Sequence, residues 1–214
     1  MEESTAKFAS GASFHTLSPA PINLVGAVAA DVAFGYHPER GVRTVPQLRS
    51  HPQRRPVMLT ATTPDDHSIV FTRNFTAPQA RVFAAMTSDD LRHWLTGPPG
   101  WTMTTCEPPT AAGMDYRYQW SGAAGEVLTL SGRCSRYEAP RLVAQTERMT
   151  MNDLPLGEYD AVLELAEADG GTAMTLSLSY ATKAMRDGAL GSGMEQGMAA
   201  NYDKLDEYLT KSNN

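Results

Sequence analysis

Apolar and polar residues alternate regularly from about residue 66 onward, and this pattern predicts a series of β-strands. Runs rich in β-branched and aromatic residues, separated by turns that contain glycine, proline or asparagine, are typical of β-hairpins. The predicted strands span 67–76, 101–107, 114–120, 127–137, 142–149, 159–166 and 173–180, with a loop around 152–155. Because most of these runs follow one another through short turns, we expect a largely antiparallel sheet.

Two short helices are predicted after the first strand, and more helix at the end of the chain. Pro78 favours the start of the first short helix, where its missing N–H costs little, and Ser88 is an expected cap of the second. Thr182 is an expected N-cap of a helix through Leu190, and Ser192 to Glu195 has the form of a capping box. A long final helix is predicted from an apolar stripe at helical spacing, formed by Met194, Met198, Asn201 or Tyr202, Leu205 and Leu209.

The order of these elements predicts the α+β class. A curved antiparallel sheet has one face that needs cover, and the final helix is the one long element available to cover it. We therefore predict a curved antiparallel sheet of about six to seven strands wrapped around a long C-terminal helix, with two short helices after the first strand. This domain is expected to occupy residues 66–212.

Residues 1–64 differ from the rest of the chain in composition. They hold seven of the 14 prolines, and they carry a net charge of +2, against −8 for residues 65–214. Prolines at this density interrupt the hydrogen bonds of both helices and sheets, so we predict a largely irregular N-terminal extension. Within it, residues 22–34 could form a short helix. The extension is either a flexible leader or an arm that acts as a lid or binds a partner.

Charge and composition exclude several classes of function. The net charge of −6 and the isoelectric point near 5.3 disfavour nucleic-acid binding and attraction to anionic membranes, both of which need a basic surface. No stretch approaches the roughly 20 apolar residues of a membrane-spanning helix, and the first residues do not resemble a signal peptide. We expect a cytoplasmic protein, and exposed edge strands would allow it to form a homodimer.

No metal or cofactor site is predicted. Cys106 and Cys134 form neither a CxxC motif nor a Cys/His pair, and the five histidines are scattered along the chain. Both cysteines are expected to be small core residues. No Ser/His/Asp set or pair of carboxylates can be assigned as catalytic from spacing alone.

Several segments, taken in order, resemble one large family. They are FTAP at 75–78 leading to Val82-Phe83, LRHWL at 91–95 followed by Gly97-Pro98, GGT at 170–172, and RDGALGSGMEQG at 186–197 with YDKL at 202–205. The chain resembles the SRPBCC (START-like) superfamily, and within it bacterial proteins similar to the C-terminal domain of the activator of the ninety-kilodalton heat-shock protein ATPase. The resemblance implies a helix-grip fold with a cavity between sheet and helix, where members bind lipids, sterols, hormones, polyketides or aromatic compounds.

The candidate ligand-binding residues are mostly aromatic or aliphatic. In a helix-grip domain the aromatic side chains that alternate along 116–120 would face the cavity, with a few polar groups to orient the ligand. The alternative is that the same side chains fill the core. In strand 142–149 either Glu147 or Arg148 points inward, and alternation alone does not decide which. The candidates are Trp94, Trp101, Tyr116, Tyr118, Trp120, Leu128, Leu130, Met194, Met198 and Asn201.

Three functions follow from these observations. The favoured one is binding of a small hydrophobic molecule, which predicts an apolar cavity with one or two polar groups. The second is an enzyme of the cyclase, dehydratase or hydrolase kind, which requires an ionisable side chain with a perturbed pKa inside the cavity. The third is a co-chaperone. The eukaryotic activators carry a large N-terminal domain with a Trp- and Asn-rich motif, whereas residues 1–64 contain no tryptophan, so a heat-shock ATPase is not the expected partner.

Overall fold

The computed structural model describes residues 58–211. Within this range eight strands form one antiparallel sheet in the order β1-β2-β8-β7-β6-β5-β4-β3. The strands are β1 (Thr60–Thr62), β2 (Ser68–Phe75), β3 (Thr102–Glu107), β4 (Asp115–Ser121), β5 (Val127–Glu138), β6 (Leu142–Met151), β7 (Leu154–Ala168) and β8 (Gly171–Tyr180). The prediction of an antiparallel sheet is confirmed, with one strand more than the six to seven expected.

The additional strand is β1, which extends the domain toward the N-terminus. Its three residues pair with β2, and the preceding Leu59 packs into the core with 9% of its surface exposed. The domain therefore begins before the boundary near residue 65 that the sequence predicts, because a three-residue strand beside Pro64 has no recognisable periodicity. The predicted helix at 22–34 and the extension through residue 57 lie outside the described residues.

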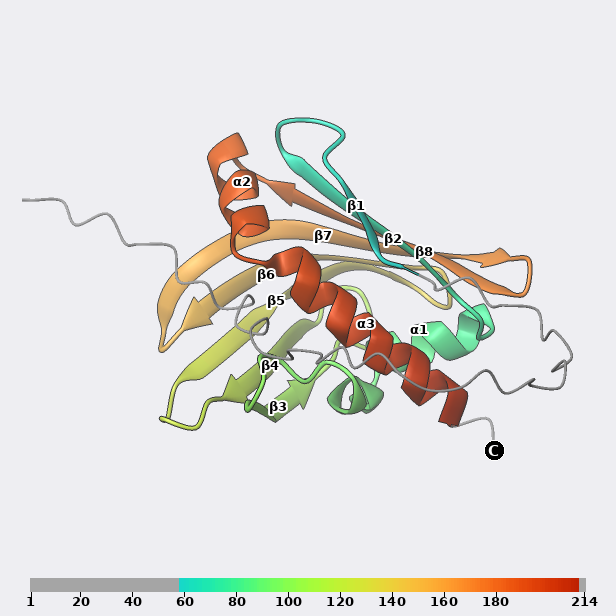
Figure 1. Cartoon of the computed structure of the whole chain (residues 1–214), viewed down its shortest axis with the longest axis horizontal. Helices are drawn as coiled ribbons and strands as arrows, with labels where there is room; N and C mark the ends of the chain where they lie inside the picture. The colour runs from blue at the N-terminus through green and yellow to red at the C-terminus, as the bar shows by residue number, and fades with distance from the viewer. Residues whose placement is uncertain (1–57, 212–214) are drawn as a thin grey trace, which may run out of the picture.

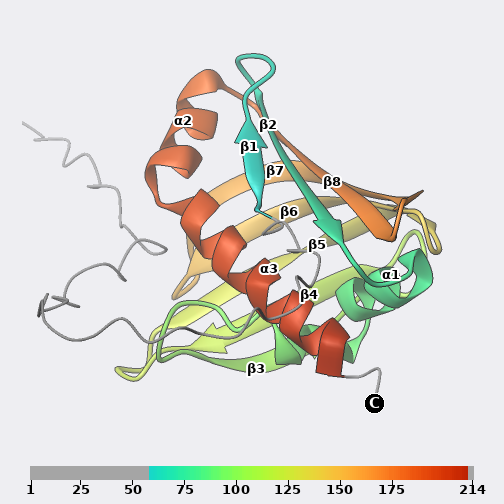
Figure 2. The same cartoon turned by 45° about the vertical axis from the view of Figure 1, so that its right-hand side comes forward.

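The helices lie on one side of the sheet. They are α1 (Gln79–Thr87), the 3₁₀ helix η1 (Asp89–His93), α2 (Lys183–Gly191) and α3 (Met194–Lys211). In Figure 1 α3 crosses the sheet obliquely, and Figure 2 shows from another side how the strands curve around it. Tyr202, Leu205 and Leu209 of α3 are buried, while Met194 and Met198 pack against the same core. The predicted helix-grip fold and the apolar stripe of its long helix are both confirmed.

The loop predicted around 152–155 is instead a tight hairpin turn. Asn152 and Asp153 both have positive φ angles, of 49° and 65°, which is the conformation of a two-residue turn that matches the twist of its strands. Strand β7 therefore begins at Leu154. Pro155 favoured a loop in the sequence-based prediction. In the structure it lies at a break in the register between β6 and β7, where a strand tolerates proline.

The capping box predicted at Ser192 is not formed. The Ser192 hydroxyl donates to the carbonyl of Ala189 and so completes the end of α2, while Gly193, with a φ angle of 80°, turns the chain into α3. A left-handed residue after a helix is a common way to end it. The cap predicted at Thr182 is confirmed, because its side chain accepts a hydrogen bond from the Met185 amide.

Candidate functional site

A cavity of about 830 Å³ lies between the concave face of the sheet and α3. Its wall is mostly aliphatic and aromatic and is built by side chains from η1, β4, β5, β6, β7, β8 and α3. The polar side chains in the wall are few, and they include Gln145, Glu147, Tyr159, Asn201 and Lys204. An apolar cavity with a few placed polar groups is the usual form of a small-molecule site.

Two tryptophans fix one side of the cavity. The indole N–H of Trp94 donates to the carbonyl of Ala85 at 2.9 Å, and that of Trp120 donates to the carbonyl of Leu95 at 2.9 Å. The ring of Trp94 also stacks on Tyr202 of α3, with 5.9 Å between the ring centres. Because their polar atoms are satisfied by the backbone, both rings present only apolar surface to the cavity.

The structure brings most of the predicted ligand-binding residues together. Those in the cavity wall are Trp94, Tyr118, Trp120, Leu128, Leu130, Met194, Met198 and Asn201. Trp101 packs instead against Gly122, in the turn between β4 and β5. Tyr116 faces the same side of the sheet as Tyr118, but it is buried and its hydroxyl donates to the carbonyl of Thr146. That these side chains contact a ligand remains a prediction.

Glu147 points into the cavity, and Arg148 points away from it. The Arg148 guanidinium pairs with Glu158 on the exposed face of β7. Glu147 shares the concave face with Val143, Gln145 and Met149, all of which line the cavity. The open question left by alternation along β6 is therefore decided: the carboxyl group faces inward.

Glu147 stands in the middle of a row of residues that crosses five strands. Tyr116 pairs with Gly132, Gly132 with Glu147, Glu147 with Tyr159, and Tyr159 with Tyr180. Residues paired across an antiparallel sheet point to the same face. The carboxyl group is thus surrounded by tyrosine rings, with a glycine on its β5 side.

Both protein partners of the Glu147 carboxyl group are hydrogen-bond donors. The Gln145 amide nitrogen donates to Glu147 Oε1 at 2.7 Å, and the Tyr159 hydroxyl also donates to the carboxyl group. Among residues 58–211, no lysine, arginine or histidine forms an ion pair with Glu147. A negative charge on Glu147 would therefore be stabilised by these hydrogen bonds alone.

Burial raises the pKa of Glu147, and the hydrogen bonds from Gln145 and Tyr159 oppose that rise only in part. The pKa values of Tyr116, Tyr159 and Tyr180 are also raised, in each case mainly by burial and further by the nearby Glu147. Loss of a proton from any of these groups would place an unpaired negative charge in an apolar interior. The site is most stable with all of them neutral.

The remainder of the wall is formed by segments rich in glycine and proline. They are Gly97–Pro99 after η1 and Gly191–Gly193 between α2 and α3. Lys204 is the one cationic side chain of the wall within the described chain, and its ammonium group donates to the hydroxyl of Thr96. This contact joins the middle of α3 to the segment after η1.

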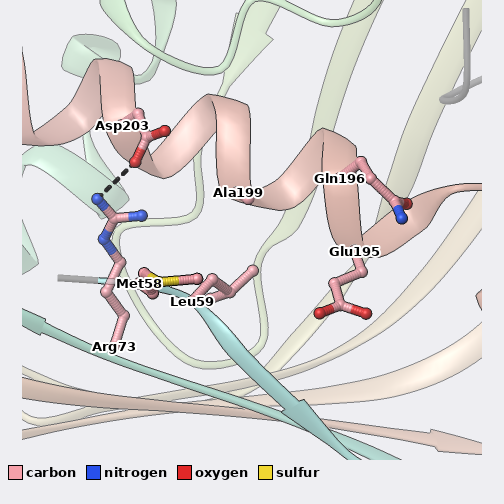
Figure 3. A pocket seen from close by; sticks show the side chains of 7 residues that line it. All are labelled: Met58, Leu59, Arg73, Glu195, Gln196, Ala199 and Asp203. Carbon is pink, nitrogen blue, oxygen red and sulfur yellow. Dashed lines mark hydrogen bonds and ion pairs between the residues drawn. The ribbon is translucent and has the colours of Figure 1, made fainter. Parts of the chain in front are cut away.

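A second, smaller pocket of about 400 Å³ lies along a neighbouring face of α3 (Figure 3). It is lined by Met58, Leu59, Arg73, Glu195, Gln196, Ala199 and Asp203. The guanidinium of Arg73 is buried there and pairs with Asp203 at 2.8 Å and with Asp206. Because this ion pair already joins β2 to α3, we assign the Arg73 side chain a structural role and take the larger cavity as the candidate site.

Gln145 and Tyr159 were not predicted as members of the site, and Glu147 was left as one of two alternatives with Arg148. All three belong to adjacent strands, β6 and β7, and their proximity depends on strand register. The one sequence signal was the polar pair Gln145 and Glu147 at alternate positions of a strand whose other inward residues are apolar. Within residues 58–211 no group of three His, Cys, Asp or Glu side chains could hold a metal, and no helix is long and apolar enough to cross a membrane.

Comparison with known proteins agrees with this geometry. Residues 76–210 match the model of a family described as Activator of Hsp90 ATPase homolog 1-like protein. A crystal structure of a protein from Rhodobacter sphaeroides is 30% identical, with a TM-score of 0.68, and the match covers 72% of this chain and 99% of that one. A search among curated proteins finds no significant match.

Two more distant structures share the fold. A protein from Mycobacterium smegmatis is 22% identical with a TM-score of 0.62, and the match covers 71% of this chain and 96% of that one. A protein from Silicibacter pomeroyi, described as AHSA1, is 17% identical with a TM-score of 0.56, covering 68% and 99%. At these identities the likeness concerns the fold alone.

Proposed function

This chain belongs to the Activator of Hsp90 ATPase homolog 1-like family, and from that premise we propose that its domain binds a small, predominantly apolar molecule beneath α3. The observation that carries the proposal is the cavity of about 830 Å³ with its mostly apolar wall. A cavity of this size is far larger than the voids of an ordinary core, which rarely exceed a water molecule. Filling it with an apolar ligand would remove that wall from water.

The test is native mass spectrometry of the full chain, purified gently from its own host, with the released molecule identified after denaturation. We expect an apolar molecule bound at one copy per chain. Met198→Trp places a larger side chain in the cavity wall and should abolish the adduct. Met185→Trp is the matched control, because Met185 is exposed on α2, and it should keep the adduct.

An empty protein would contradict the proposal only if it also fails to bind added ligands. A panel of fatty acids, sterols and aromatic compounds, tested by isothermal titration calorimetry, provides that measurement. Absence of binding to the whole panel would indicate that the cavity does not serve as a binding site.

An enzymatic function is the second candidate, because Glu147 is an ionisable side chain inside the cavity and its pKa is raised. Raised carboxyl pKa values are a feature of general acids in cyclases, dehydratases and hydrolases. The measurement is the mass of the bound molecule before and after incubation with the protein. Conversion by the wild type that stops in Glu147→Gln would favour the enzyme, and an unchanged mass would favour a carrier.

A further inference from the structure

The hydrogen bonds of Glu147 indicate which kind of molecule the cavity accepts, provided that the cavity binds a ligand as proposed above. A carboxyl group that is ionised has only acceptors, whereas a neutral one has a single O–H donor as well. Both partners of Glu147, the Gln145 amide and the Tyr159 hydroxyl, donate to it. The Gln145 nitrogen cannot accept the proton of the neutral acid, and the Tyr159 hydroxyl does not accept it while it donates to the other carboxyl oxygen.

The surroundings favour the neutral acid. The titratable groups whose pKa values Glu147 raises are Tyr116 and Tyr118 from β4, Tyr159 from β7, Tyr180 from β8 and Tyr202 from α3. None of them carries a positive charge in any protonation state. Lys204, the cation of the cavity wall, is engaged with Thr96. An ionised Glu147 would thus be a half-buried charge in an apolar wall with no counter-ion, which is more costly there than the neutral acid.

With Gln145 and Tyr159 both donating, the proton of this acid is available to a ligand, because Glu147 lines the cavity. We propose that Glu147 binds as a neutral carboxylic acid and donates a hydrogen bond to a carbonyl oxygen of the ligand, so that the cavity selects uncharged ketones, aldehydes or esters with an apolar body. An anionic carboxylate is disfavoured because the wall around Glu147 offers it no cation. An amine is disfavoured because it would require Glu147 to ionise.

The experiment compares four naphthalene compounds that differ in one substituent: 2-acetylnaphthalene, 2-isopropenylnaphthalene, 2-naphthoate and 2-(aminomethyl)naphthalene. The first two have nearly the same shape, and only the ketone accepts a hydrogen bond. Binding to the full chain is measured by isothermal titration calorimetry at neutral pH. We expect the ketone to bind about tenfold more tightly than the hydrocarbon, and both to bind more tightly than the two charged compounds.

Two substitutions at Glu147 identify the group responsible. Glu147→Gln keeps a neutral donor of similar shape and should retain the preference for the ketone. Glu147→Leu removes the donor, and it should bind the ketone and the hydrocarbon equally. Met198→Trp should weaken the binding of all four compounds.

Infrared difference spectroscopy gives a measurement that does not depend on how Glu147→Leu folds. The spectrum of the wild type minus that of Glu147→Gln should contain the carbonyl stretch of a neutral carboxylic acid at neutral pH. This band should move to lower frequency when 2-acetylnaphthalene binds. Absence of the band would overturn the inference.

The outcomes separate this inference from the proposed function. Equal affinity of the wild type for the ketone and the hydrocarbon would overturn the inference and leave the binding function standing. Tightest binding of the amine would show that Glu147 is ionised in the complex, and it too would overturn the inference alone. If none of the four compounds binds, the inference is overturned, and the binding function fails with it only if the panel of fatty acids, sterols and aromatic compounds also does not bind.

Discussion

At the scale of single residues, Glu147 is the least expected side chain of the cavity. An isolated carboxylate in an apolar interior is costly, and proteins usually avoid the cost by pairing the charge or by keeping the group protonated. Here Gln145 and Tyr159 supply hydrogen bonds, and no ion pair from the described residues supplies a positive charge. The carboxyl group therefore makes stability depend on pH.

The pH dependence of stability has a definite sign at Glu147. In the unfolded chain the carboxyl group loses its proton near 4.5, whereas in the folded state its pKa is raised by burial. Above 4.5 the folded state therefore holds a proton that the unfolded state has lost, so stability falls as the pH rises toward the folded-state pKa. Glu147→Gln has no such proton. We therefore expect its free energy of unfolding, relative to that of the wild type, to increase as the pH rises.

Urea unfolding of both proteins at a series of pH values measures this difference. Glu158→Gln is the control, because Glu158 is an exposed glutamate on the neighbouring strand. A constant difference between wild type and Glu147→Gln across the series would contradict the assignment of Glu147 as a buried neutral acid.

At the scale of elements, the pairing of β5 with β6 depends on a glycine. A Cβ atom added at Gly132 would lie only 1.8 Å from the carbonyl oxygen of Thr146. The same oxygen accepts a hydrogen bond from the Tyr116 hydroxyl. A side chain at position 132 would therefore push the two strands apart. The absence of a side chain at Gly132 thus allows β5 and β6 to pair closely beside Glu147.

Gly132→Ala should destabilise the protein by about 3 kcal/mol, because the added methyl group meets backbone rather than a flexible side chain. Gly157→Ala on β7 is the matched control, since nothing lies within 4 Å of the Cβ it would add. The control should change stability by less than about 1 kcal/mol. Equal effects of the two substitutions in chemical denaturation would show that β5 and β6 adapt to the added atom.

The attachment of α3 to the sheet depends on a buried arginine. Arg73 of β2 has 3% of its side chain exposed, and its guanidinium pairs with Asp203 and Asp206 on successive turns of α3. It also lies over the ring of Phe75, 5.6 Å from the ring centre. Breaking a buried pair by removing one partner is costly, whereas replacing the buried charge by an apolar side chain often is not.

The double substitution Asp203→Ala with Asp206→Ala should therefore cost about 3 kcal/mol or more, and Arg73→Met should cost less. Arg133→Ala removes an exposed pair with Asp115, and we expect a change of about 0.5 kcal/mol or less. The free energy of unfolding in urea measures all three. A larger loss in Arg73→Met than in the double variant would contradict the assigned role of the buried charge.

At the scale of the whole molecule, the domain is a curved sheet closed by one helix over a cavity. Its two edges are β1 and β3, and Leu59 next to β1 fills part of the core. The folded unit therefore includes residues that the sequence analysis assigned to the N-terminal extension.

A chain that begins at residue 58 should be more stable than one that begins at residue 66. The shorter chain lacks β1 and the buried side chain of Leu59, and burying a leucine contributes about 2 kcal/mol. Thermal unfolding of both chains at equal concentration gives the comparison. Equal midpoints would place the domain boundary after β1, as the sequence analysis predicted.

Every strand except β1, the helices and the face of α3 that packs on the sheet were predictable from sequence. The apolar stripe of α3 and the alternation of Tyr116, Tyr118 and Trp120 are local patterns, and local patterns determine which face of an element is apolar. Alternation could not decide between Glu147 and Arg148, because a bulge or a one-residue shift of register reverses the faces of a strand. The turn at Asn152 was missed for a related reason, since the nearby proline has different meanings inside and beside a strand.

The sequence by itself determined the α+β class and a sheet wrapped around one long helix, because these depend on periodicity and on the order of the elements. The cavity and its apolar wall were expected from the family resemblance. Only the tertiary structure decided that Glu147 faces the cavity, that its partners Gln145 and Tyr159 both donate to it, and that no cation among residues 58–211 pairs with it. Those facts depend on how β5, β6 and β7 align and on what α3 covers. The physical reason is that the electrostatic free energy of a charged group depends on the groups around it in space. Around Glu147 those groups come from strands that are distant in sequence.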